Sequence, residues 1–196
     1  MNSKQALEKL KAGNQKYVNS DNTPANHEYI AEQKPFAVVL SCADSRVPAE
    51  AIFNQGVGDI FVVRVAGNIA TPSQIGSIEF ACENFGSSLI VVLGHSGCGA
   101  IKASIGCSEN GTDGLSPSLK SIVDEILPAI EPVLNNAEIK PAELLQASTK
   151  ANVEKTILDI TNKSSLLKGL VDQGNLEIIG AEFSVETGLV NFYNSN

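Results

Sequence analysis

Short apolar runs alternate with longer amphipathic stretches along the whole chain. The runs are rich in β-branched residues and are bounded by polar residues or glycine, a pattern typical of fully buried parallel strands. A turn at Thr187–Gly188 separates the last two runs and predicts a terminal hairpin. The sequence therefore predicts strands at residues 36–41, 60–64, 89–93, 176–181 and 189–193.

The stretches between these runs predict helices. The first helix carries Ala6, Leu7 and Leu10 on one face and stops in the polar segment 19–24. The alternation predicts an α/β fold with a mainly parallel sheet of four strands, a short antiparallel edge strand and flanking helices. Further helices are predicted at residues 48–53, 72–85, 99–105, 118–134 (interrupted by Pro128 and Pro132) and 141–170, with a loop at 107–117.

Size and charge narrow the possible functions. A chain of 196 residues fits one hydrophobic core, so we expect a single domain over residues 1–196. The 22 acidic against 14 basic residues argue against nucleic acid or an anionic membrane as a partner. No apolar run approaches the length of a membrane span, and the N-terminus does not resemble a signal segment. We therefore expect a cytoplasmic protein.

Two motifs each follow a predicted strand. Residues 41–46 read Ser-Cys-Ala-Asp-Ser-Arg, and residues 94–99 read Gly-His-Ser-Gly-Cys-Gly. Ligands of open parallel sheets bind outside the carboxyl ends of the strands. Cys42, His95 and Cys98 would there supply three ligands to a tetrahedral zinc ion, with the fourth position left to water or to an adjacent carboxylate.

Other interpretations of these residues fit less well. A phosphatase-type cysteine needs an arginine six residues later, but position 48 is proline. Gly94 to Cys98 nearly matches a serine hydrolase motif, yet no histidine follows Ser96 to act as the base. A lone histidine beside a strand is more often structural, but Cys98 three residues later and Cys42 at the end of a parallel strand reverse that expectation.

The remaining cysteines and the arginines have simpler alternatives. Cys82 lies in a helical pattern and Cys107 in a predicted loop, so we interpret them as a small buried apolar residue and a bystander. Arg46 and Arg64, the only arginines, both follow apolar runs, where a fixed cation would face a site. Their alternative is a structural ion pair.

Over nearly its whole length, the chain resembles the β-class carbonic anhydrases. The resemblance rests on residues 41–47, 61–68 and 94–99, with further similarity at 6–14 and 180–188. It implies an N-terminal helix that clasps a partner in a homodimer or tetramer. It also implies one zinc ion per chain, held by Cys42, His95 and Cys98, and reversible hydration of carbon dioxide to bicarbonate and a proton.

The resemblance also assigns roles around the metal. Asp44 and Arg46 would form a catalytic dyad, and Asp44 would bind zinc only in a closed state. The substrate pocket would be formed by Gln33, Phe61, Ala66, Phe80 and the backbone N–H of Gly99, with Phe80 standing where many relatives have tyrosine.

Two features concern proton transfer and regulation. His27, the only other histidine, is a candidate proton shuttle. Some relatives bind bicarbonate at a second site built around a tryptophan three residues before the first cysteine. Position 39 is valine here, and an anion beside it would lose hydration without gaining a partner. We therefore expect the open-site subclass, without a bicarbonate switch.

A non-catalytic protein in which zinc only stabilises the fold is the alternative. A purely structural site would not require Asp44, Arg46 and Gln33, so their presence favours the enzyme.

Overall fold

The computed structural model describes residues 1–19 and 32–193, which fall into two units, Met1–Lys34 and Pro35–Asn196. In the first unit, helix α1 (Ser3–Val18) begins at a capping box in which Asn2 and Gln5 satisfy each other's backbone N–H groups. None of its residues is buried, and Leu7 and Leu10 are 52% and 73% exposed. The helix therefore presents an uncovered apolar stripe.

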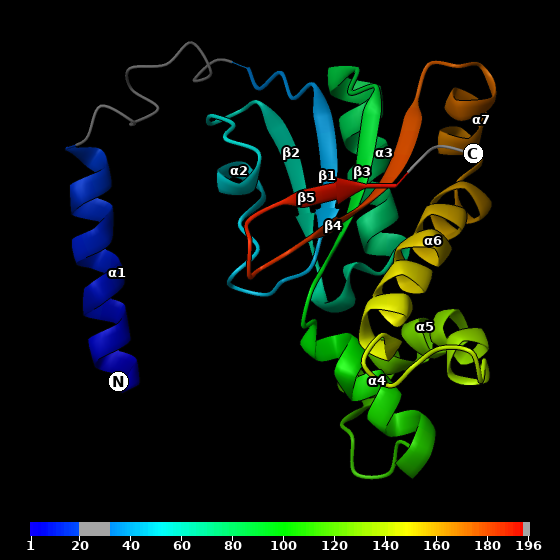
Figure 1. The fold of residues 1–196 in the computed structure, drawn as a ribbon. Helices are drawn as coiled ribbons and strands as arrows, with labels where there is room; N and C mark the ends of the chain where they lie inside the picture. Colours follow the sequence, from blue (N-terminus) through cyan, green and yellow to red (C-terminus); the bar gives the residue numbers. More distant parts are fainter. Residues whose placement is uncertain (20–31, 194–196) are drawn as a thin grey trace. The chain divides into compact units, whose positions relative to one another are not determined.

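The second unit is built on a five-stranded sheet (Figure 1). The spatial order is β2-β1-β3-β4-β5, and only β5 runs antiparallel to its neighbour. This arrangement confirms the predicted parallel sheet of four strands with an antiparallel edge. The strands are β1 (Ala37–Ser41), β2 (Ile60–Arg64), β3 (Leu89–His95), β4 (Glu177–Phe183) and β5 (Val190–Phe192).

Helices cover both faces of this sheet. On one face, Val38, Leu40 and Ile90 pack among buried side chains of α3, α6 and α7. On the other face, Val39 and Val91 pack around the start of α2. The helices are α2 (Ala49–Ile52), η3 (a 3₁₀ turn, Ala66–Asn68), α3 (Pro72–Phe85), α4 (Gly99–Asn110), α5 (Pro117–Leu134), α6 (Leu144–Lys163) and α7 (Ser165–Asp172).

Several predicted boundaries were wrong. Helix α4 continues to Asn110, so Cys107 is helical rather than in a loop, and the helix ends at Gly111, whose φ of 78° suits glycine. The predicted helix 141–170 is two helices, because the Ser164 hydroxyl accepts from Leu167 N–H at 3.1 Å and starts α7. A glycine backbone conformation sets the first of these ends, and a local side-chain hydrogen bond sets the second.

Helix α5 runs through both of its prolines, contrary to the predicted interruption. Pro128 and Pro132 each remove one backbone donor. The buried side chains of Val123, Ile126 and Ile130 hold the helix against the core across these positions. Packing therefore outweighs the local cost of proline.

In the described part of the chain, no helix is both long enough and apolar enough to cross a bilayer.

Candidate metal centre

The sheet register brings the two motifs together. Ser41 of β1 pairs with Leu93 of β3, so the segments that follow these residues leave the same edge of the sheet. His95 ends β3, and Cys98 caps α4. The ligand atoms of Cys42, His95 and Cys98 all lie within 4.8 Å of one another, and the two sulfurs are 4.0 Å apart. All three residues are buried.

The histidine has one nitrogen prepared for a metal. His95 Nδ1 lies 3.0 Å from the carbonyl oxygen of Ser96, which fixes the proton on that nitrogen. Nε2 is buried and has no hydrogen-bond partner. A buried polar atom without a partner is costly, and coordination would satisfy it. Two sulfurs and one imidazole nitrogen are a donor set that suits zinc, so the residues present fit the metal that the motifs predict.

The two cysteines are poised as a thiol–thiolate pair. Their mutual hydrogen bond lowers the pKa of Cys42 and raises that of Cys98, because the two sulfurs share one proton. The backbone N–H of Gly67 also donates to Cys42 Sγ, at 3.4 Å. Both contacts favour the thiolate form of Cys42, which is the form that binds a metal.

Asp44 lies next to the centre and is held by Arg46. Its Oδ2 is 3.9 Å from His95 Nε2. Arg46 donates to Oδ1 from its backbone N–H and from Nε, both at 3.0 Å, and to Oδ2 from Nη2 at 2.8 Å. These hydrogen bonds hold the pKa of the Asp44 carboxyl well below its usual range. Asp44 is thus ionised and fixed beside the ligand atoms.

Arg64 supports the first motif through its backbone. Its Nε donates to the carbonyl of Cys42 at 3.1 Å, and its Nη2 donates to the carbonyl of Asp44 at 2.6 Å. Arg64 therefore fixes the segment from Cys42 to Asp44. Its role there is structural, because both hydrogen bonds go to backbone carbonyls.

The other predicted site residues lie on different elements. Phe61 of β2 and Phe80 of α3 have ring centroids 6.5 Å apart, and Phe80 is 49% exposed. Ala66 opens η3, and Gly99 is the first residue of α4. Gln33 is exposed and belongs to the first unit, whereas the centre lies in the second.

Two further predictions concern residues away from the ligand atoms. His27 lies outside the described residues. Val39 lines a cavity of about 190 Å³ on the sheet face. The residues that line this cavity carry no charge: they are Gln55 and residues with apolar side chains.

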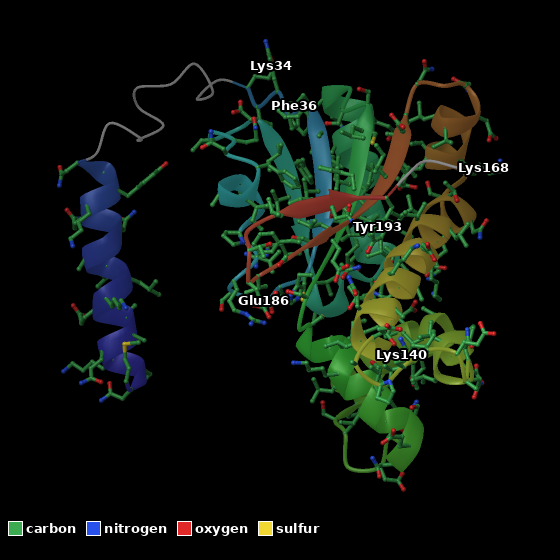
Figure 2. All side chains as sticks on the ribbon, in the orientation of Figure 1. Lys34, Phe36, Lys140, Lys168, Glu186 and Tyr193 are labelled. Atoms are coloured by element: carbon green, nitrogen blue, oxygen red, sulfur yellow. The ribbon has the colours of Figure 1, made fainter. Side chains whose placement is uncertain are left out.

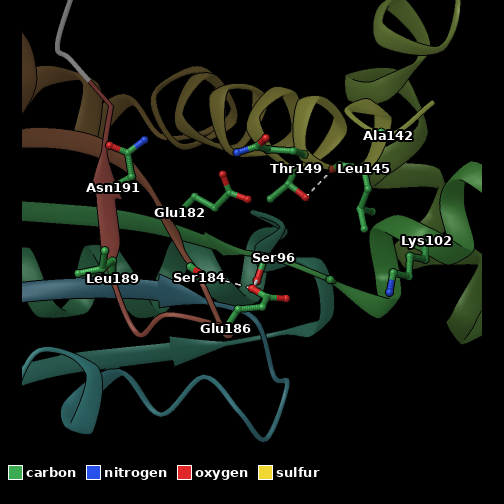
Figure 3. Close-up of a pocket in the computed structure, with 12 residues that line it drawn as sticks. Ser96, Lys102, Ala142, Leu145, Thr149, Glu182, Ser184, Glu186, Leu189 and Asn191 are labelled. Carbon is green, nitrogen blue, oxygen red and sulfur yellow. Dashed lines mark hydrogen bonds between the residues drawn. The ribbon is translucent and has the colours of Figure 1, made fainter. Parts of the chain in front are cut away.

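The sequence did not indicate the cleft beside the second motif (Figure 3). Its volume is about 530 Å³. Ser96 Oγ donates to Glu186 Oε2 at 2.6 Å and accepts from Val185 N–H at 2.9 Å, which ties the motif to the β4–β5 turn. Figure 2 places Glu186 at that turn. Burial raises the pKa of Glu182, which lines the same cleft.

Comparison with known proteins agrees with this geometry. The family model described as carbonic anhydrase matches residues 37–190. "Carbonic anhydrase 2" of Mycobacterium tuberculosis is 34% identical over 191 residues, covering 93% of this chain and 89% of its own. The carbonic anhydrase of Mycolicibacterium smegmatis is 33% identical, covering 94% and 90%. The chain belongs to the β-class carbonic anhydrases.

Solved structures of this class share the fold. The β-carbonic anhydrase CcaA superposes with a TM-score of 0.83 at 24% identity, covering 97% of this chain and 88% of its own. CafA of Aspergillus fumigatus gives 0.78 at 26% identity, covering 97% and 90%. Family and fold therefore agree with the prediction made from the two motifs.

Proposed function

We propose that this carbonic anhydrase hydrates carbon dioxide reversibly to bicarbonate and a proton, with one zinc ion held by Cys42, His95 and Cys98. The observation that carries the proposal is the buried set of three ligand atoms with the Asp44 carboxylate beside it. Zinc bound there would lower the pKa of its water ligand to about 7, making hydroxide available at neutral pH.

Asp44 and Arg46 would orient the nucleophile. An ionised carboxylate can only accept hydrogen bonds, so Asp44 would accept the hydrogen bond of the attacking hydroxide and turn the oxygen's lone pair toward carbon dioxide. Arg46 supports this role because its bidentate contact fixes the carboxylate. In a closed state, Asp44 would leave Arg46 and become the fourth metal ligand.

Carbon dioxide requires an apolar pocket with few donors. Phe61, Ala66 and Phe80 would supply the apolar lining. The backbone N–H of Gly99 would act as one donor, since the first N–H groups of a helix have no partner within it. The side-chain amide of Gln33 would act as the other.

We further propose that the protein works as a homodimer or tetramer in the cytoplasm, with α1 clasping the partner subunit. The exposed apolar stripe of α1 supports this assembly, because an amphipathic helix gains stability by burying that face. β-Carbonic anhydrases of Sordaria macrospora, of the same fold, are tetrameric. Gln33 would then reach the pocket of the neighbouring subunit.

A stopped-flow pH-indicator assay with and without a chelator tests the function. We expect rapid hydration that is lost with the metal and restored by zinc. Asp44→Asn should keep the zinc and lose most of the activity. A zinc-loaded protein without hydration activity would instead indicate the structural-zinc alternative.

Gln33→Ala tests the pocket separately. It removes a donor and no ligand, so turnover should fall while zinc content stays at one per chain. Activity equal to that of the parent protein would remove Gln33 from the site.

A further inference from the structure

A hydrogen-bonded path links helix α6 to a cysteine of the centre. The Gly67 N–H donates to Cys42 Sγ at 3.4 Å, and the Gly67 carbonyl accepts from Asn152 Nδ2 at 2.8 Å. Asn152 is 1% exposed and lies on α6, a helix that supplies no ligand. The buried side-chain amide of Asn152 thus holds Gly67, the residue whose backbone N–H donates to Cys42 Sγ.

The turn that contains Gly67 has little freedom of its own. Gly67 has a φ of 73°, a conformation that favours glycine. A Cβ there would lie 2.7 Å from Ile126 Cδ1 and 3.3 Å from Ala100 Cβ, so α5 and α4 press against the turn from one direction. From α6, the Asn152 side chain holds the turn by donating to the Gly67 carbonyl. Loss of that hydrogen bond would leave a buried carbonyl unpaired.

Helix α6 also lies directly against the second motif. A Cβ on Gly94, the residue before His95, would be 2.8 Å from Val153 Cγ2 and 3.0 Å from Thr149 Cγ2. Neighbouring residues of α6 therefore contact the backbone of the second motif at Gly94 and of the 3₁₀ turn at Gly67. Asn152 is the member of this helix whose contact leads to a ligand atom.

We propose that Asn152 is a positioning residue of the metal centre: it holds the 3₁₀ turn so that the Gly67 N–H donates to Cys42 Sγ. This inference rests on the proposed zinc site. Partners one step outside a metal's ligands orient them, and their removal typically weakens metal affinity about 10- to 100-fold. A thiolate that loses its N–H donor is also less stable in buried surroundings.

Two substitutions test the proposal. Asn152→Leu removes the amide at similar volume, and Asn152→Asp keeps the shape but replaces the donor with an oxygen. Each should raise the zinc dissociation constant about tenfold, measured by competition with a chromogenic chelator. In the cobalt-substituted protein, each should also shift the sulfur-to-cobalt charge-transfer band. Ser148→Ala is the matched control, because it removes a buried hydroxyl of α6 that has no hydrogen-bond partner.

The outcomes separate this inference from the proposed function. If the unaltered protein binds no zinc, the proposed function is wrong. If it binds zinc, and a folded Asn152 variant binds zinc equally and has the same cobalt spectrum, Asn152 only supports the fold and the inference is wrong. A variant that differs from the parent protein only by a lower unfolding midpoint would likewise show that Asn152 only supports the fold. Should Asn152→Leu not fold, the isosteric Asn152→Asp decides.

Discussion

The close contact between α6 and β3 can be tested by replacing Gly94 with alanine. The added methyl would lie 2.8 Å from Val153 Cγ2 and 3.0 Å from Thr149 Cγ2, well inside the ordinary carbon–carbon contact of about 3.5–4.0 Å. Both neighbours are β-branched and have few alternative rotamers, so the helix or strand must shift. Overpacking of this kind typically costs about 1–3 kcal/mol, and we expect about 2 kcal/mol for Gly94→Ala.

A second substitution tests whether this contact causes the loss of stability expected for Gly94→Ala. Val153→Ala alone removes two buried methyl groups, worth about 1.6 kcal/mol in transfer free energy before any cavity cost. In the Gly94→Ala background it also makes room for the new methyl. The double variant should therefore be more stable than the sum of the single effects predicts, by about 1–2 kcal/mol.

Equilibrium unfolding in guanidinium chloride, followed by circular dichroism, measures these differences. Zinc must be present at the same excess throughout, because a ligand of the native state adds to its stability. Gly76→Ala in α3 is the control: its Cβ meets nothing within 4 Å, so helix propensity alone should stabilise it by up to about 1 kcal/mol. Wild-type stability for Gly94→Ala, or strictly additive effects in the double variant, would refute the packing explanation.

Three further predictions concern the centre and the cysteines. Cys42→Ser should lose both zinc, measured by mass spectrometry, and hydration activity, since one of three ligands is gone. The folded pKa of Asp44 lies below its unfolded value near 3.8, so its pairing with Arg46 stabilises the fold above that pH and the contribution disappears on further acidification. The stability difference between wild type and Asp44→Asn should then shrink below pH 4. In the folded, zinc-loaded protein at pH 8, alkylation should label the half-buried Cys107 and spare Cys82, whose pKa burial raises to about 11. Labelling of Cys82 at the rate seen in denaturant would contradict this.

The sheet and the cluster of Cys42, His95 and Cys98 were predictable because both follow from local patterns. β1, β2 and β3 each contain a short β-branched run, and parallel strands place the residues after them at one edge. This rule alone predicts that Cys42 lies near His95 and Cys98. The boundaries that depend on single side chains, such as the break at Ser164, were not predictable from periodicity.

The supporting contacts could not be predicted for a different reason. Asn152 and Gly67 form a hydrogen bond although they are 85 positions apart in the sequence, and Ser96 and Glu186 do so at a separation of 90 positions. Nothing in a helical pattern marks an asparagine whose partner is a distant carbonyl. The glycine in Ala66–Asn68 was a signal of a special backbone, but its contact with sulfur depends on the packing of α4, α5 and α6.

The spacing of the ligands has a consequence for the order in which the protein matures. His95 and Cys98 lie three positions apart, whereas Cys42 and Cys98 are separated by 56 positions. During synthesis, a chain that ends before residue 95 can offer a metal only one of the three ligands. The neighbouring pair can bind as soon as it emerges, but Cys42 joins it only when β1 has paired with β3. In the proposed zinc site, coordination by all three residues would therefore require that the centre of the sheet has formed.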